Sequence, residues 1–343
     1  MPTRTLSAVV VGVLLAACSG DVTVDVDNTR PGRDAGGSSD TRDASPPGDA
    51  QADAGRPGTP DAQDRPDASP PQAGKVDLWT WEYNVATDAA AQERFFEFAA
   101  KSGVRTAYLE SEALLKEHDE HLAAFLRRAA SQGMTIEFLV GAPSWAKTDE
   151  HDYVVSLAKL AATFTSRLDG PRPVALHLDV EPHGLPGWGQ NKESLGNQYL
   201  DLLEKVKAAL AGSGLALAVD VNAFYDRVMV PRKGRTRPLS EWIFDTVDRV
   251  AVMSYRDHAA PPDGILALAE AEIAQAAAAG KLAIVGVETG CEIGEDPPII
   301  TFCDEGRAVL ERELDKIQEQ LRGQPGFGGI AIHHYSSLVS LKP

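Results

Sequence analysis

Between Val26 and Val76 the sequence contains no leucine, isoleucine, valine, methionine or aromatic residue. The stretch consists mainly of Asp, Ala, Gly, Pro, Ser and scattered Arg. A segment with nothing apolar to bury cannot offset the entropy cost of ordering, so residues 21–74 are expected to be a disordered linker. This linker contributes part of the net charge of −17. Because a chain this acidic lacks the basic face that nucleic-acid binding needs, we expect no nucleic-acid partner.

The N-terminal apolar run is too short to span a bilayer as a mature helix. Arg4 precedes the run, which covers residues 6–17 and ends in Leu15-Ala16-Ala17-Cys18. A run of this length is typical of a signal peptide. The small residues directly before Cys18 resemble the lipobox of bacterial lipoproteins. That resemblance implies a signal peptide over residues 1–17, a lipidated Cys18 and a tether over residues 18–74.

The lipobox resemblance also implies a location. Several acyl chains on one residue would anchor the protein firmly, since a single chain is only marginal. Ser19 follows the cysteine where an aspartate would direct inner-membrane retention. We therefore expect a monomeric cell-envelope protein, lipid-anchored through Cys18 to the outer membrane, at its periplasmic face or at the cell surface.

Cys291 and Cys303 are the only other cysteines. Outside the cytoplasm, two cysteines close in sequence are typical of a disulfide. Closing so short a loop is worth about 3 kcal/mol in the chain-entropy model. No His/Cys cluster with structural-zinc spacing accompanies the pair, which makes a metal site the weaker interpretation.

From Lys75 to the end, short β-rich segments alternate with amphipathic helical stretches. The expected strands are Val76–Tyr83, Val104–Glu110, Thr135–Gly141, Val174–Glu181, Leu215–Asn222, Arg249–Tyr255, Lys281–Glu288 and Phe327–His334. The expected helices lie near Asp88–Lys101, Glu112–Gln132, Glu150–Leu168, Ser194–Ala211, Leu239–Val247, Leu266–Ala279 and Glu305–Leu321.

This alternation predicts the fold of residues 75–343. Strands that alternate strictly with helices are parallel and joined by crossovers, and eight of them over about 250 residues fit a (β/α)8 TIM barrel. The alternative is an open doubly wound sheet, although no Gly-rich dinucleotide turn follows the first strand. Because only residues 335–343 follow the eighth strand, we expect the eighth helix to be missing or a single turn.

Polar and acidic side chains end most of the predicted strands. TIM-barrel enzymes place their sites at these C-terminal ends, and packing does not require so many carboxylates there. The residues at the strand ends are Glu82, Glu110, Asp179, Glu181, Asp220, Asn222, Tyr255, Asp257, Glu288, His333, His334 and Tyr335.

The segment Ala175–Pro182 carries the sharpest signal. Side chains alternate along a strand, so His177, Asp179 and Glu181 share one face, while apolar residues form the other. The apolar face should meet the helices, which turns the polar residues into the barrel. Burial there should raise the pKa of one carboxyl group, as a general acid requires near neutral pH. A structural polar network in the lower barrel is the alternative.

Asp179-x-Glu181 resembles the tail of the chitinase-type glycoside hydrolase signature. In that family the Glu is the general acid, and the Asp assists a substrate N-acetyl group that acts as the nucleophile. Val252-Met253-Ser254-Tyr255 resembles the Met-x-Tyr of the same family, in which the tyrosine contacts the reacting sugar. Two features differ: Val174 and His177 replace earlier aspartates of the signature, and Arg256 displaces the aspartate after the tyrosine to Asp257.

Glu181-Pro182 together with Glu288 is similar to the retaining glycosidase clan, whose acid and nucleophile lie on strands four and seven. Val180 stands where that clan has Asn. Glu181 is the acid under both resemblances, which differ in the nucleophile. Most of residues 76–340 also resembles uncharacterised bacterial barrel proteins that share the His-x-Asp-x-Glu-Pro, Met-x-Tyr-Arg-Asp and His-His-Tyr segments.

The sequence lacks the residues that several other classes of enzyme require. No histidine pair stands on the first strand for a metal-dependent amidohydrolase, and no Gly-x-Ser-x-Gly elbow occurs. Gly326, Gly328 and Gly329 precede or begin strand eight, the wrong end for a phosphate site. A metal site from His177, His333 and His334 with Asp179 stays as a weaker alternative. We expect no cofactor.

We therefore predict an anchored glycoside hydrolase-like protein that acts on polysaccharide, glycan or cell-wall material, with a non-catalytic carbohydrate-binding lipoprotein on a degenerate barrel as the alternative. Fold alone does not separate the two. The predicted catalytic residues are Glu181, Asp179, Glu288 and Tyr255. The predicted sugar-binding residues are Trp79, Trp81, Glu82, Glu110, Trp145, His177, Trp188, Asp220, Asn222, Asp257, His334 and Tyr335, with the four tryptophans placed to stack on pyranose rings.

Overall fold

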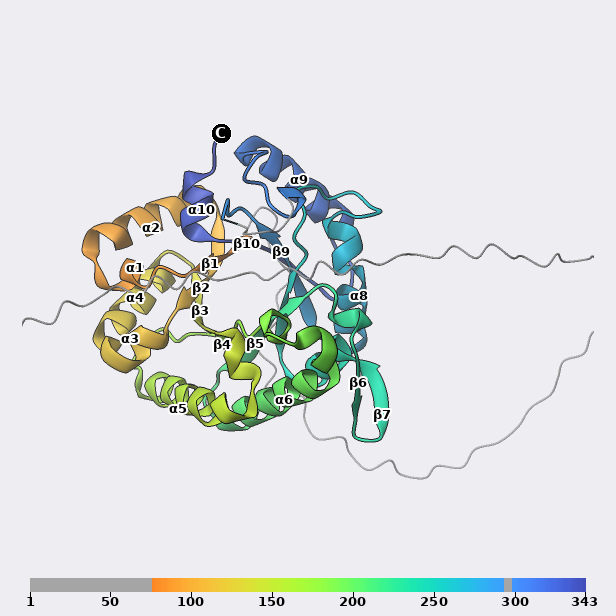
Figure 1. Ribbon diagram of the computed structural model, residues 1–343. Helices are drawn as coiled ribbons and strands as arrows, with labels where there is room; N and C mark the ends of the chain where they lie inside the picture. The colour runs from red at the N-terminus through yellow and green to blue at the C-terminus, as the bar shows by residue number, and fades with distance from the viewer. Residues whose placement is uncertain (1–75, 293–297) are drawn as a thin grey trace, which may run out of the picture. The chain divides into compact units, whose positions relative to one another are not determined.

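The computed structural model describes residues 76–292 and 298–343, which contain a closed barrel surrounded by helices (Figure 1). The expected signal peptide, the lipidation site Cys18 and the tether lie outside the described residues. None of the helices within the described ranges is long and apolar enough to cross a membrane.

Eight parallel strands form the barrel, and pairing of β1 with β10 closes it. In ring order from β1 the strands are β1 (Val76–Thr80), β10 (Phe327–His333), β9 (Leu282–Glu288), β8 (Arg249–Met253), β5 (Ala216–Asn222), β4 (Ala175–Leu178), β3 (Thr135–Val140) and β2 (Val104–Glu110). The closed ring confirms the predicted TIM barrel and excludes the open sheet. Strand β1 ends at Thr80 and β4 at Leu178, before their predicted ends, so Trp81, Asp179 and Glu181 belong to the loops at the rim.

The helices agree with the predicted pattern except in three places. They are α1 (Asn84–Thr87), α2 (Ala89–Lys101), α3 (Glu112–Glu117), α4 (Asp119–Ser131), α5 (His151–Arg167), α6 (Trp188–Ala209), α7 (Leu239–Thr246), α8 (Ile265–Ala278), α9 (Arg307–Leu321) and α10 (Tyr335–Ser340). The short helix α1 was not predicted. The single helix predicted over residues 112–132 is wrong, because His118 adopts φ −140° and ψ 40° between α3 and α4. Helix α6 begins at Trp188 and not at Ser194. The six residues of α10 confirm a reduced eighth helix.

A β-hairpin that the sequence did not predict follows β5. Its strands β6 (Met229–Arg232) and β7 (Arg235–Pro238) pair antiparallel. Lys233 and Gly234 both have positive φ, 51° and 75°, which is the backbone of a two-residue type I′ turn. Residues 229–238 contain two prolines and four basic residues, so they lack the alternation of apolar and polar side chains that predicts a strand. The hairpin is held by the Trp242 indole, which donates to the carbonyl of Val230 at 3.0 Å.

The apolar core lies between the strands and the helices, whereas the interior of the barrel is polar and aromatic. In β4, Leu176 and Leu178 face the helices and are fully buried in the main hydrophobic cluster. His177 points into the barrel, as the alternation predicts, and is 1% exposed. The polar residues of the lower interior are Asp77, Arg105, Tyr108, Glu137, His177 and Arg249.

Candidate active site

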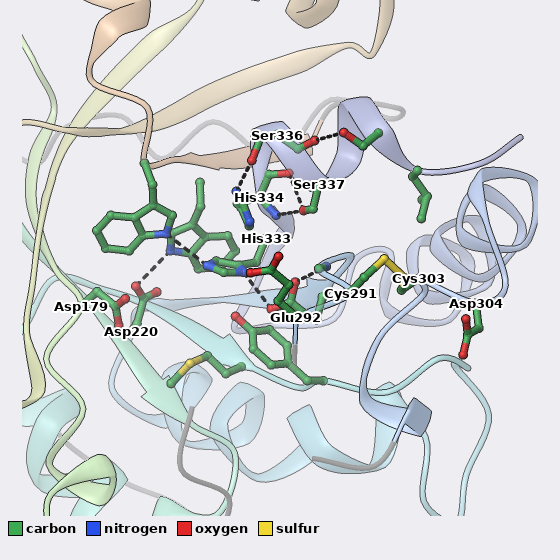
Figure 2. Close-up of a pocket in the computed structure, with 18 of the residues that line it drawn as sticks. Asp179, Asp220, Cys291, Glu292, Cys303, Asp304, His333, His334, Ser336 and Ser337 are labelled. Carbon is green, nitrogen blue, oxygen red and sulfur yellow. Dashed lines mark hydrogen bonds and ion pairs between the residues drawn. A yellow bond between two sulfur atoms is a disulfide. The ribbon is translucent and has the colours of Figure 1, made fainter. Parts of the chain in front are cut away.

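A cavity of about 790 Å³ opens at the C-terminal ends of the strands. The residues that line it come from distant parts of the sequence. They are Trp79, Trp81, Asp179, Glu181, Asp220, Met253, Tyr255, Glu288, Gly290, Cys291, Glu292, Cys303, Asp304, His333, His334, Ser336, Ser337, Ser340, Leu341 and Lys342. Figure 2 shows Asp179 and Asp220 at one side of this cavity and the Cys291–Cys303 bridge at the other. All four predicted catalytic residues thus border one space.

His177 lies below the cavity and contacts Asp220, which lines it. Its Nδ1 lies 2.8 Å from Glu137 and its Nε2 lies 3.0 Å from Asp220. Burial opposes protonation, but the two carboxylates outweigh it and raise the pKa of His177 to about 10. The other oxygen of Asp220 accepts a hydrogen bond of 3.0 Å from the Trp79 indole. Predicted as a sugar ligand, His177 instead lies below the cavity and fixes Asp220.

Asp179 and Glu181 leave β4 side by side and share a common environment. Burial, followed by the charge of Asp220, raises the pKa of Asp179 to about 7. Burial and the neighbouring carboxyl groups of Asp179 and Asp220 raise the pKa of Glu181 well above its ordinary value. Glu181 is 7% exposed and still borders the cavity. Glu181 therefore borders the cavity in surroundings that favour its protonated form.

The surroundings of Glu288, at the end of β9, have the opposite effect on its pKa. Its Oε1 accepts hydrogen bonds from the backbone N–H groups of Thr289 and Gly290, at 2.8 and 2.6 Å. Its Oε2 lies 2.7 Å from Nδ1 of His333. Burial opposes ionisation, but His333 and the N–H of Gly290 outweigh it and lower the pKa of Glu288. Glu288 is therefore held as a carboxylate.

Trp81 orients the histidine that holds Glu288. The indole N–H of Trp81 lies 3.1 Å from Nε2 of His333. An indole N–H can only donate, so Nε2 accepts, and the ring proton is on Nδ1, from where it is donated to Glu288. Of the two tryptophans on this side, Trp79 is 1% exposed and forms the floor of the cavity, so its faces are covered by neighbouring residues.

Two glycines allow this close assembly. A Cβ on Gly141, directly after β3, would lie 2.0 Å from the backbone oxygen of Asp179. A Cβ on Gly286 in β9 would lie 2.7 Å from the backbone oxygen of Val252 and 3.2 Å from the Trp79 ring. Any larger residue at these positions would move Asp179 or Trp79, because both contacts are too short for a real side chain.

Besides His177, seven predicted sugar-binding residues do not line the cavity. Trp145 packs edge-on against Tyr153, and Trp188, at the start of α6, packs against Tyr225; both are nearly buried. The 3-10 turns η1 (Pro143–Ala146) and η3 (Pro182–Gly184) fold these loops back onto the helices. The other five are Glu82, paired with His334; Glu110, bonded to the Glu112 N–H; Asn222, bonded to His183; Asp257, paired with His258; and Tyr335, packed on Phe95 and Phe98.

The predicted disulfide between Cys291 and Cys303 is confirmed. The two Cα atoms are 5.2 Å apart, within the normal range for a disulfide. Both cysteines border the cavity, so the bridge forms part of its wall. Within the described residues, no group of three or more His, Cys, Asp or Glu side chains is arranged to hold a metal ion.

Sequence reasoning missed two kinds of residue at this site. His183 lies in η3, two positions after Glu181, and its Nε2 is 3.2 Å from the Glu181 carboxyl group. The short segment Glu181-Pro182-His183 was a signal that could have been used, since a Pro-started turn brings the next residues back beside the strand end. Ser336, Ser337 and Ser340 of α10 also border the cavity, because the reduced eighth helix lies over its mouth.

Solved structures with a similar fold include carbohydrate-active barrels. A chitinase from Chromobacterium violaceum is 14% identical, with 78% of this chain and 97% of that chain covered and a TM-score of 0.47. A GH113 β-1,4-mannanase is 14% identical, with coverage of 77% and 88% and a TM-score of 0.46. For β-glucuronidase 2 from Bacteroides uniformis the identity is 12%, the coverage 78% and 31%, and the TM-score 0.52. No protein-family model matches the chain, and no curated protein matches it significantly. At these identities the similarity is one of fold alone, a TIM barrel.

Proposed function

We propose that the barrel is a glycoside hydrolase in which Glu181 is the general acid and Glu288 is the second carboxylate. One observation carries this proposal: carboxyl groups from β4 and β9 border the same cavity while their surroundings displace their pKa values in opposite directions. Two carboxyl groups whose pKa values are pushed apart are the arrangement that divides acid and anion roles in glycosidases.

Each group is suited to its part of the reaction. Glu181 keeps its proton near neutral pH and donates it to the glycosidic oxygen, so the leaving sugar departs as an alcohol. Glu288 stays ionised and faces the positive charge that develops at the anomeric carbon, where it stabilises this charge and forms the covalent intermediate of a retaining reaction. Water then attacks that intermediate, with Glu181 as the base.

The alternative nucleophile is an acetamido group of the substrate, assisted by Asp179 and Tyr255. Both residues border the cavity. However, burial and the charge of Asp220 raise the pKa of Asp179 to about 7, which favours its protonated form, whereas the pKa of Glu288 is lowered and Glu288 is held as an anion. We therefore favour Glu288. We further propose that the enzyme acts in the cell envelope on polysaccharide, glycan or cell-wall material, lipid-anchored through Cys18 at the outer membrane.

Leaving-group dependence tests the role of Glu181. A glycan substrate needs protonation of its leaving oxygen, whereas a dinitrophenyl glycoside does not. Glu181→Gln should therefore lower kcat/KM about 10²–10⁴-fold on the glycan and only slightly on the aryl glycoside. Glu288→Gln should lower it on both, because both pass through the same positive charge. Substrates come from a glycan panel screened with the wild type.

Glu110→Gln is the matched control. Glu110 also has a pKa raised to about 7, by burial, but it does not line the cavity. Its replacement should leave the hydrolysis rate unchanged. An equal loss of activity on the two substrates in Glu181→Gln would contradict the acid role, and absence of hydrolysis by the wild type over the whole panel would contradict the proposed function.

A further inference from the structure

Three residues form a hydrogen-bonded chain behind Glu181. His183 of η3 contacts the Glu181 carboxyl group through Nε2, at 3.2 Å from Oε2. The same Nε2 lies 3.2 Å from the side-chain nitrogen of Asn222, at the end of β5. On the other side of the ring, Nδ1 lies 2.9 Å from the hydroxyl of Tyr225 in η4 (Tyr225–Arg227). None of these contacts involves substrate space, since His183, Asn222 and Tyr225 do not line the cavity.

The orientation of the Asn222 amide follows from its backbone contact. Its Oδ1 accepts a hydrogen bond of 3.0 Å from the N–H of Phe224. The opposite orientation would place an NH2 group against that N–H. The NH2 group of Asn222 therefore points at His183, and it donates.

This donor decides where His183 carries its proton. A proton on Nε2 would face the NH2 group of Asn222, so Nε2 must be the unprotonated nitrogen. The proton is then on Nδ1 and is donated to Tyr225. Burial lowers the pKa of His183 to about 4, so the ring is neutral at pH values above that.

The unprotonated nitrogen in turn acts on Glu181. An ionised carboxylate 3.2 Å from Nε2 would set its negative charge against the lone pair of that nitrogen, which already accepts from Asn222, whereas a neutral carboxyl group avoids this repulsion. We propose that His183 is a positioning residue that keeps the acidic proton on Glu181 by presenting an unprotonated ring nitrogen, and that Asn222 enforces this state. The catalytic role of this arrangement rests on the proposed function, but the tautomer of His183 and the pKa of Glu181 can be measured without it.

Asp179 also favours the protonated form of Glu181, because its charge and its side-chain hydrogen bond to Glu181 both raise the pKa of that group. The other titratable groups that act on Glu181 are acids or phenols, which carry no positive charge. They are Asp220, Glu288, Tyr199, Tyr225 and Tyr255. His183 is the base beside these groups, and a proton on its Nε2 would favour ionised Glu181.

The first measurement is the tautomer itself. Long-range ¹⁵N–¹H NMR of the barrel domain within the full chain distinguishes Nδ1–H, Nε2–H and doubly protonated rings without any need for activity. We expect His183 to carry its proton on Nδ1 between about pH 5 and pH 8, whereas a free imidazole in water favours Nε2. A proton on Nε2, or a charged ring at pH 7, would overturn the proposal.

The second measurement removes the amide that enforces the tautomer. In Asn222→Ala, Nε2 is free to carry the proton and to donate it to Glu181, with the Tyr225 hydroxyl donating to Nδ1. The pKa of Glu181, followed by ¹³C NMR of labelled glutamate and assigned with Glu181→Gln, should then fall by about one pH unit or more. The alkaline limb of kcat/KM should move to lower pH by the same amount.

Asn197→Ala is the matched control, because Asn197 of α6 bonds only to backbone and hairpin groups on the outer surface. It should change neither the tautomer nor the pKa of Glu181. An unchanged Glu181 pKa in a folded Asn222→Ala variant would overturn the proposal. If the NMR changes occur but no glycan is hydrolysed, the proposed function fails while the role of His183 stands.

Discussion

Buried carboxylates occur at two levels of the barrel interior, and their surroundings differ. In the lower level, Glu137 has Arg249 and His177 beside it, and these outweigh burial and lower its pKa. In the upper level, Glu181 and Asp179 lie beside each other, and their pKa values are raised. The same residue type is thus an ion pair at one level and a carboxyl group with a raised pKa at the other.

The comparison explains why the carboxylates alone do not mark the site. Asp77 is fully buried and receives two hydrogen bonds from Arg105, at 3.0 and 2.9 Å, and one from Tyr108. Every acid of this lower group has a cation within reach, so it contributes to the fold. Asp179 and Glu181 differ in having other carboxyl groups as their nearest charged neighbours, which favours their protonated forms.

The largest expected effect separates the two levels by stability. Glu137→Gln leaves the His177 imidazolium and Arg249 without their shared counter-charge in a buried site, so the free energy of unfolding should fall by about 3–5 kcal/mol. The matched change Glu181→Gln replaces one neutral group by another and should leave it unchanged or higher. Urea denaturation of both variants measures this, and equal losses would remove the distinction between the levels.

A smaller effect concerns the wall of the upper cavity. Replacing both cysteines by serine, Cys291→Ser with Cys303→Ser, reopens a loop of 12 residues and should lower the free energy of unfolding by about 3 kcal/mol. Because the lower level does not touch this loop, the double variant combined with Glu137→Gln should show additive losses. A clear departure from additivity would mean that the two levels are energetically coupled.

A third effect is a change in the shape of the pH–stability curve. The pKa of Asp179 is raised from 3.8 to about 7, so the folded protein binds this proton more tightly than the unfolded chain does. Its contribution to stability is complete below about pH 4 and is lost as pH rises through 7. The pKa of His177 is raised from 6.5 to about 10, so its contribution is complete below about pH 6.5 and is lost as pH rises through 10.

Asp179→Asn should therefore reduce the decline between pH 4 and pH 7, to which Glu110 and Glu181 also contribute, and keep the decline through pH 10. Thermal unfolding of the wild type and the variant between pH 4 and pH 10 gives the difference curve. If the difference between the two proteins does not vary between pH 4 and pH 7, the proton on Asp179 is held no more tightly in the folded state, and the upper level does not differ from the lower one in the way described.

The local sequence pattern was sufficient to predict the barrel and the direction of the side chains in strand four. The alternation in residues 175–181 placed His177 inside and the leucines outside, and both placements follow from the two-residue period of a strand. The bounds of strands and helices were less accurate where rim loops begin. His118 interrupts a helical pattern that periodicity alone continues, and the turn at Lys233–Gly234 makes a hairpin from residues with little strand character.

Which residues line the cavity depends on the conformation of the rim loops. Trp145 and Trp188 follow strands just as Trp81 does, yet 3-10 turns bury them against helices, while Trp81 extends to His333. Glu110 ends its strand in the same way as Glu288 but bonds to its own loop. No periodicity distinguishes these cases, because the direction of a rim residue is set by contacts with other loops.

The sequence pattern predicts the order of the eight barrel strands and most of the helices between them, the disulfide pair, and several carboxylates at one rim. Those properties depend on neighbouring residues, chain length and the parallel direction of the strands. Which carboxyl group favours its protonated form depends on the closed barrel. The protonation of Glu181, Glu288 and His177 depends on charges and hydrogen bonds from residues that lie far apart in the chain and meet only when the barrel closes.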